Sequence, residues 1–236
     1  IPPAFNRRSW NEYPNYVTLS SDGNLIIAGT MDKSNYVVEV QNHVTFLMKL
    51  KSDIPKTMDL FYSYADYVRG MSYWNTIKPF KVPFVKVIEV NDGYYIGTYF
   101  ELPNSKMAIQ LLKTNFTGAV TWEKKYVGLG NAMLYDFIIN SDGSLMLTGM
   151  STDKEMNFEF SEAFASSKII LIKTDPSGNE IFTKYYGSDL NTSMAKRIFQ
   201  NGNNGWDLAG FTSLTNNGLD KMMLFKVDKN LSLFNF

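Results

Sequence analysis

A β-hairpin pattern that recurs along this 236-residue chain constrains its fold more than any other feature. The clearest copy, IILIKTDPSGNEIFTKYYG at residues 169–187, joins two apolar, β-prone runs through a DPSGN turn. Pro presets φ for a turn, Gly supplies positive φ, and Asp and Asn can bond their own backbone. The segment is therefore predicted to be a hairpin.

The strand that opens this hairpin sets a period for the whole chain. It reads LMKL, LLKT, LIKT and LFKV, with Lys at positions 49, 113, 173 and 226, at intervals of 64, 60 and 53 residues. A second hairpin precedes it each time, with turns at 21–24, 91–93, 141–144 and 201–205. Four strands in each unit at such a period are typical of propeller blades. We expect each repeated Lys to be a solvated strand end that guards the sheet edge.

The predicted fold class is all-β, a β-propeller-like array of about four four-stranded antiparallel blades in a single domain, 1–236. Residues 10–13, WNEY, look like a worn copy of the WEKKY run at 122–126, so they are either an outer strand that closes the ring or a fifth, partial blade. A closed ring and an open arc both fit, and the end faces of an arc would need a partner. At 191–200, the best candidate for a helix, we expect a loop that runs into a strand.

Composition excludes several functional classes. With 23 basic and 23 acidic residues, the chain lacks the basic footprint of a nucleic-acid binder. It has no Cys and a single His, His43, which excludes disulfides, thiolate zinc sites, cysteine nucleophiles and histidine clusters. No apolar run approaches the roughly 20 residues of a transmembrane segment. We expect no cofactor and no metal, and we assign no catalytic residue.

Two long insertions, 63–83 and 151–167, carry the candidate site. In a propeller both emerge on the same face, where function concentrates. The first is rich in Tyr and Trp beside Asp66 and an Arg, which suits a sugar ring or a peptide side chain, although these aromatics also suit packing over the ring. The second alternates Phe with Glu, and its carboxylates are either solvated or an acid and base for glycoside hydrolysis. The candidate ligand-binding residues are Tyr64, Tyr67, Arg69, Tyr73, Trp74, Phe158 and Glu159.

The aligned units resemble the β-propeller repeats of Bacteroidetes-type exported proteins and lipoproteins over nearly the whole chain. The third unit carries SDGSLMLTG, LIKTDPSG and FTKYYG, and the second carries NDGYYIG, LLKTNFTG and TWEKKYVG. The first unit lacks the Gly after its third strand, and the fourth has Lys229-Asn230 where that Gly would fall. The resemblance implies an extracytoplasmic location, in the periplasm or on the outer-membrane surface, and carries over no catalytic residue. Because the chain starts with Ile1 rather than Met, we expect an upstream segment, which leaves room for a signal or a lipid anchor.

Three functions fit these patterns. We favour a non-enzymatic exported propeller that binds a glycan, a peptide or a protein through the face built by 63–83 and 151–167. One alternative is a carbohydrate-active propeller enzyme that uses the loop carboxylates. The other is a structural component of a larger cell-surface assembly, which an open arc with an apolar flank would favour. The pattern leaves the ligand and the oligomeric state open.

Overall fold

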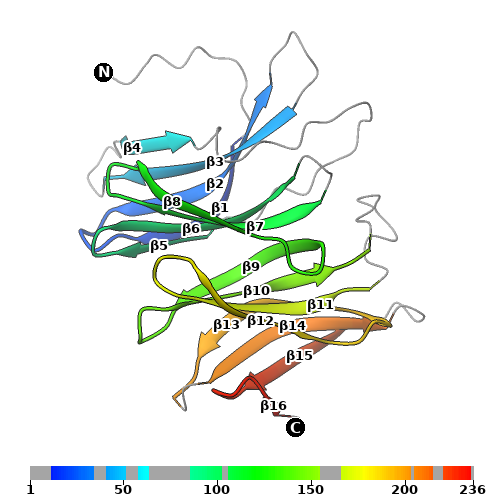
Figure 1. Cartoon of the computed structure of the whole chain (residues 1–236). Coiled ribbons are helices and arrows are strands. Elements are labelled where there is room, and N and C mark those ends of the chain that lie inside the picture. Colours follow the sequence, from blue (N-terminus) through cyan, green and yellow to red (C-terminus); the bar gives the residue numbers. More distant parts are fainter. Residues whose placement is uncertain are drawn as a thin grey trace. The chain divides into compact units, whose positions relative to one another are not determined.

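The computed structural model describes residues 12–34, 41–51, 58–63, 86–102, 106–154, 166–202, 205–214 and 220–234. These residues form sixteen strands in four antiparallel sheets and contain no helix (Figure 1). In every sheet the four strands follow one another in chain order. The prediction of an all-β, propeller-like array of four four-stranded blades is confirmed. We name the sheets blades A to D in chain order.

The chain divides into two compact units, Ile1–Val85 and Lys86–Phe236, which are described separately. The prediction of a single domain stays a prediction. The first unit holds blade A, with strands β1 Glu12–Leu19, β2 Leu25–Ser34, β3 Gln41–Leu50 and β4 Met58–Ser63. Glu12 and Tyr13 begin β1, where they pair with Met31 and Thr30. Residues 12 and 13, the last two of the WNEY run, therefore belong to the first strand of blade A and not to an outer strand of another blade. Trp10 and Asn11 lie outside the described residues.

The second unit holds blades B, C and D. Blade B comprises β5 Lys86–Val90, β6 Gly93–Glu101, β7 Met107–Thr114 and β8 Val120–Tyr126. Blade C comprises β9 Asn131–Ile139, β10 Leu145–Thr152, β11 Lys168–Thr174 and β12 Glu180–Tyr186. Blade D comprises β13 Asn191–Gln200, β14 Trp206–Leu214, β15 Asp220–Val227 and β16 Leu233–Phe234. The expectation of a loop at the start of 191–200 is wrong, because β13 pairs with β14 along this whole range.

Apolar side chains fill the space between consecutive blades of this unit. Leu111 of blade B packs in one cluster with Phe137 and Leu147 of blade C. Leu171 of blade C packs in a second cluster with Ile198 and Leu208 of blade D. Because blade C lies between blades B and D, both of its faces are covered, and β10 is buried at every position. Each such Leu or Ile stabilises the fold by about 1.5–3 kcal/mol.

The repeated Gly near the middle of the second strand accommodates a β-bulge. The first strand carries an extra residue at this point in blades C and D, where Tyr135 and Lys196 interrupt the pairing register. A Cβ on Gly149 would lie 1.8 Å from the carbonyl oxygen of Met133, and one on Gly210 would lie 1.9 Å from that of Met194. Only Gly therefore allows this close approach of two backbones.

Three of the repeated Lys residues, at positions 49, 113 and 173, form ion pairs, which corrects the expectation of solvated strand ends there. The Nζ atom of Lys113 lies 2.6 Å from Asp92 Oδ1, and that of Lys173 lies 3.1 Å from Asp142 Oδ2. Lys49 and Asp22 form the same pair in blade A. Each of these three Lys residues therefore ties the third strand to the Asp-Gly turn of its own blade. The hydroxyl of Ser144, together with Lys173, lowers the pKa of Asp142 to about 2.

The turn between the third and fourth strands also repeats. Asp175 Oδ1 accepts hydrogen bonds from the backbone N–H groups of Ser177 and Asn179. Asp228 makes the equivalent bonds in blade D, where Leu231 has φ +66° in the place of Gly178, which has φ +76°. The fourth unit therefore keeps the turn without its Gly, at the cost of a strained leucine.

Candidate functional site: the connection end of the second unit

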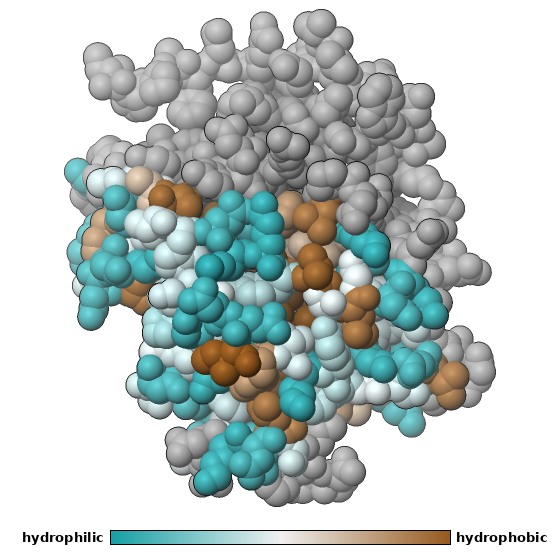
Figure 2. Space-filling view, viewed as in Figure 1, coloured by the Kyte–Doolittle hydropathy of each residue, from teal (hydrophilic) through white to brown (hydrophobic). Residues whose placement is uncertain are grey.

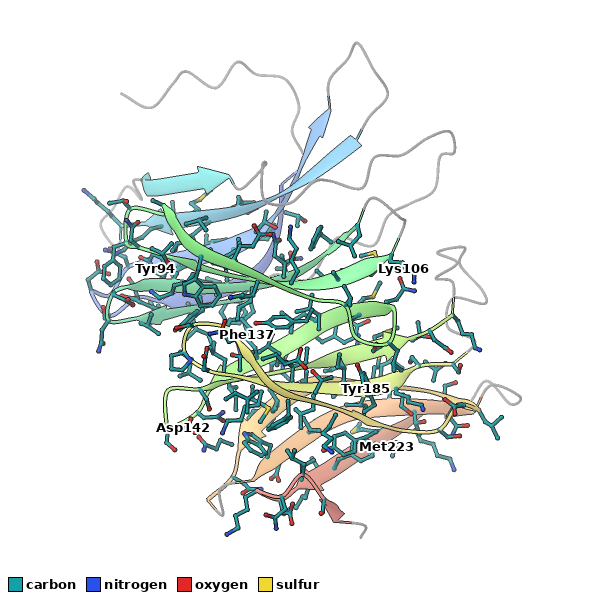
Figure 3. The ribbon with its side chains drawn as sticks, in the orientation of Figure 1. Tyr94, Lys106, Phe137, Asp142, Tyr185 and Met223 are labelled. Carbon is teal, nitrogen blue, oxygen red and sulfur yellow. The ribbon has the colours of Figure 1, made fainter. Side chains whose placement is uncertain are left out.

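In blades B, C and D, the connections from the second to the third strand and from one blade to the next leave from one end of the strands, which we call the connection end. The short hairpin turns lie at the other end, the turn end. Figure 3 shows Lys106, which precedes β7, and Asp142, in the β9–β10 turn, on opposite sides of the unit. The predicted insertion at 151–167 belongs to the connection end, because it joins β10 to β11.

The candidate residues chosen from the sequence all fall outside the described residues, so their contacts stay predictions. They are Tyr64, Tyr67, Arg69, Tyr73, Trp74, Phe158 and Glu159. The structure does describe the residues on either side of segment 155–165 in the second insertion. We call these residues, 151–154 and 166–168, the stem.

Asn131 anchors the first side of this stem. Its side chain is buried at the start of β9, where Oδ1 accepts a hydrogen bond from Met107 N at 2.8 Å. Its Nδ2 donates to the carbonyl oxygen of Lys154 at 2.9 Å. Ser151 Oγ donates to the backbone oxygen of Asn131 at 2.8 Å. One buried amide thus joins blade B, the first strand of blade C and the departing end of the insertion.

The Thr152 side chain links the two sides of the stem. Its Oγ1 donates to the carbonyl oxygen of Ser166 at 2.7 Å and accepts from Lys154 N at 3.1 Å. Thr152 and Ser166 are both buried. The two ends of segment 155–165 are therefore held together by hydrogen bonds that are shielded from water.

Ser167 and Ser193 tie the same stem to blade D. Ser167 forms a parallel bridge with Thr192, and its Oγ donates to the carbonyl oxygen of Ser193 at 3.0 Å. Ser193 N donates back to Ser167 O at 2.8 Å. Beside them, Lys168 Nζ lies 2.8 Å from Asp189 Oδ1 and lowers the pKa of that carboxyl group. Hydroxyl and amide groups thus fix the stem against both neighbouring blades.

A buried carboxylate that the sequence analysis missed joins the first strands of all three blades. Asp136 Oδ1 lies 2.6 Å from Lys86 Nζ and accepts from Phe137 N at 2.9 Å. Its Oδ2 accepts from Ile198 N at 3.0 Å. Because both oxygens already accept strong donors, this carboxylate serves as a structural anchor. The available signal was a pair of opposite charges, Lys86 and Asp136, at equivalent positions of two otherwise apolar strands.

The bulge residues bring a cation against an aromatic ring. Lys196 Nζ lies 3.2 Å from the centroid of the Tyr135 ring and 5.8 Å from that of Phe211. Burial raises the pKa of Tyr135 well above its usual value. This arrangement stabilises the ammonium group through the ring faces.

Two further findings limit the chemistry of the described part of the chain. No group of three or more His, Asp or Glu side chains there is placed to hold a metal ion. None of the described segments forms a helix long and apolar enough to cross a membrane.

Comparisons with known proteins give structural neighbours but no family. No protein-family model matches the chain, and no curated protein matches it. A solved mannose phosphorylase from Leishmania mexicana is similar with a TM-score of 0.45 and 11% identity over 95% of this chain, which spans 66% of that protein. A GH43_1 enzyme from Xanthomonas citri has a TM-score of 0.45 and 8% identity over 96% of this chain and 91% of its own. A GH43 β-xylosidase/α-arabinofuranosidase from a compost metagenome, in complex with xylotriose, has a TM-score of 0.43 and 11% identity over 96% of this chain and 95% of its own. Similarity this low does not reveal what the chain does, so function has to be argued from its own residues.

Proposed function

We propose that this chain is a glycan-binding β-propeller whose ligand is bound at the connection end. The stem of the 151–167 insertion carries the proposal. Asn131 and Thr152 hold both ends of segment 155–165 at a buried, hydrogen-bonded base. A binding loop needs a rigid support of this kind, because contacts are made at less entropic cost when the loop is positioned in advance.

The chemistry of the insertions favours a sugar. Tyr73 and Trp74 in 63–83 supply aromatic faces for the apolar face of a sugar ring, and the nearby Arg69 supplies donors for its hydroxyl groups. The same residues also suit a peptide side chain, so a peptide is the competing ligand. An extracytoplasmic location, in the periplasm or at the cell surface, is part of the proposal and rests on the resemblance of the repeats.

Glycoside hydrolysis is the second candidate. Segment 151–167 carries Glu155, Glu159 and Glu162, and glycosidases need two carboxylates at a set separation. Within the described residues, the buried carboxylate of Asp136 is bonded through both oxygens, so it is a structural anchor and not a candidate acid or base. The glutamates of the insertion therefore carry this alternative.

A binding screen over a panel of soluble glycans and peptides tests the proposal. We expect the full chain to bind a glycan, and Tyr73→Ala and Trp74→Ala each to weaken binding at least about tenfold. Phe116→Ala is the matched control, because Phe116 is an exposed aromatic in the β7–β8 turn, at the turn end. Binding of peptides alone, or glycan binding that neither variant changes, would refute the proposal.

An assay for released reducing sugar on the same glycans separates the two candidates. Binding without turnover supports the binding module. Turnover that is lost in Glu155→Gln, Glu159→Gln or Glu162→Gln supports the enzyme instead.

A further inference from the structure

Every blade of the second unit stacks in one direction. Blade C presents Phe137 and Leu147 to blade B, and we call this its incoming face. It presents Ile169 and Leu171 to blade D, and we call this its outgoing face. The outgoing face of one blade thus packs on the incoming face of the next, at both the B–C and the C–D contact.

The outgoing face of blade D is the equivalent of this buried surface, and it is open. Counted back from the repeated Lys of the third strand, Met222 and Leu224 of blade D are equivalent to Ile169 and Leu171 of blade C. Ile169 and Leu171 are both 0% exposed, whereas Met222 is 92% exposed and Leu224 is 63% exposed. Phe199, on the same face of β13, is 56% exposed. Figure 2 shows hydrophobic patches among the hydrophilic residues on one side of the described surface.

Blade A, in the first unit, has the equivalent of the incoming face. Val17 of blade A is equivalent to Phe137 of blade C. Each pairs with the residue that lies two positions before the repeated Gly of the second strand, which is Ile27 in blade A and Leu147 in blade C. Phe137 is 0% exposed under the preceding blade, whereas Val17 is 60% exposed and Leu19 is 67% exposed. The incoming face of blade A is therefore open as well.

We propose that two copies of this chain associate through these faces, with the outgoing face of blade D in one copy stacked on the incoming face of blade A in the other. The contact continues the stacking that already joins B to C and C to D, so the occupant is a surface the chain itself supplies. Exposed apolar groups on a sheet face favour such burial. Because the two faces differ, the contact is heterologous, and copies add to one another in one direction.

Sedimentation velocity on the full chain, over a roughly hundredfold range of concentration, tests this association. We expect the wild-type chain to grow beyond a monomer with concentration. The variants Met222→Lys/Leu224→Lys and Val17→Lys/Leu19→Lys each lose one face and stay monomeric alone. The control is Ile181→Lys, which changes another exposed apolar residue, 56% exposed, on β12.

Mixing the two double variants gives the decisive result. Each retains the face that the other lacks, so an equimolar mixture forms a one-to-one complex that does not extend further. A monomeric wild-type chain at every concentration would overturn the proposal. So would self-association that either double variant retains alone, or that Ile181→Lys abolishes. Circular dichroism establishes that each variant keeps its sheet content.

Discussion

The ammonium group of Lys86 lies 2.6 Å from Asp136 Oδ1 and joins the first strands of blades B and C. The same ammonium group donates to the carbonyl oxygen of Phe137 at 2.7 Å. The other oxygen of Asp136 accepts from Ile198 N, in the first strand of blade D. One buried carboxylate therefore connects the first strands of three consecutive blades, and their alignment depends on it.

Replacing this carboxylate should destabilise the chain more than replacing an exposed one. Asp136→Asn leaves the Lys86 charge mostly buried without its counter-ion, so we expect a loss of about 3 kcal/mol or more in the free energy of unfolding. Asp92→Asn should cost less, because Asp92 is 78% exposed and Lys113 keeps the carbonyl oxygen of Thr114 as an acceptor. Urea denaturation measures both. Lys86→Met/Asp136→Asn should recover part of the loss, and equal effects of Asp136→Asn and Asp92→Asn would contradict the anchoring role.

Three Gly→Ala variants should distinguish the loss of stability caused by a positive φ from the loss caused by a clash of the new Cβ atom with its neighbours. Gly178 has φ +76°, and a Cβ atom added to it would lie 2.8 Å from the Trp122 side chain. Gly23 has a similar φ of +79°, but a Cβ atom added there would have no heavy atom within 4 Å. Gly202 has neither constraint. We expect Gly178→Ala to be the most destabilising, Gly23→Ala to cost about 1 kcal/mol, and Gly202→Ala to stay within about 0.5 kcal/mol of wild type. Thermal or urea unfolding ranks them, and a tolerated Gly178→Ala would contradict the turn assignment.

The hydroxyls of Tyr95, Tyr126 and Tyr186 each donate a hydrogen bond across a contact between blades. Tyr126 donates to the carbonyl oxygen of Gly178 at 2.7 Å, and Tyr186 donates to that of Leu231 at 3.1 Å. Removing either hydroxyl by Tyr→Phe should cost about 1 kcal/mol and leave a buried carbonyl with one partner fewer. Tyr185→Phe is the control, since its hydroxyl makes no hydrogen bond to the residues that the structure describes. If the three variants unfold at the same urea concentration, these bonds do not stabilise the stack.

Alkaline pH should weaken the second unit through the same tyrosines. Burial raises the pKa of Tyr186 to about 12, whereas tyrosine in an unfolded chain ionises near 10. Between these values the unfolded state gives up a proton that the native state retains, so stability is unaffected below about pH 10 and falls as the pH rises toward about 12. Unfolding free energies measured across this range should show the decline. A Tyr126→Phe/Tyr186→Phe variant should show a shallower one, and an unchanged slope would contradict the assignment.

The sequence predicted the blades well because their signals are local. Turn residues such as Gly178 and Asp175, and apolar runs such as LIKT, specify hairpins without reference to distant residues. The strand at 191–200 was missed in part because its polar start becomes regular only through pairing with β14. The role of Lys173 was missed for a similar reason, since its partner Asp142 lies 31 residues away.

The candidate site was harder to predict. The aromatic residues of 63–83 and the Phe and Glu of 151–167 stand out by type, but their positions lie outside the described residues. The stem that supports the second insertion consists of Asn, Ser and Thr, which are common in any loop. Only the contacts between blades, such as Met107 N with Asn131 Oδ1, distinguish these residues from ordinary turn residues.

Hydrogen–deuterium exchange of the full chain, with and without the glycan that binds most tightly in the screen, tests the central claim most directly. Glycan binding at the connection end should slow exchange in peptides that cover 63–86 and 151–168. Exchange in the β9–β10 turn at 140–144, at the turn end, should be unchanged. Slowing at 140–144 with none at 63–86 or 151–168 would place the ligand at the other end and contradict the account.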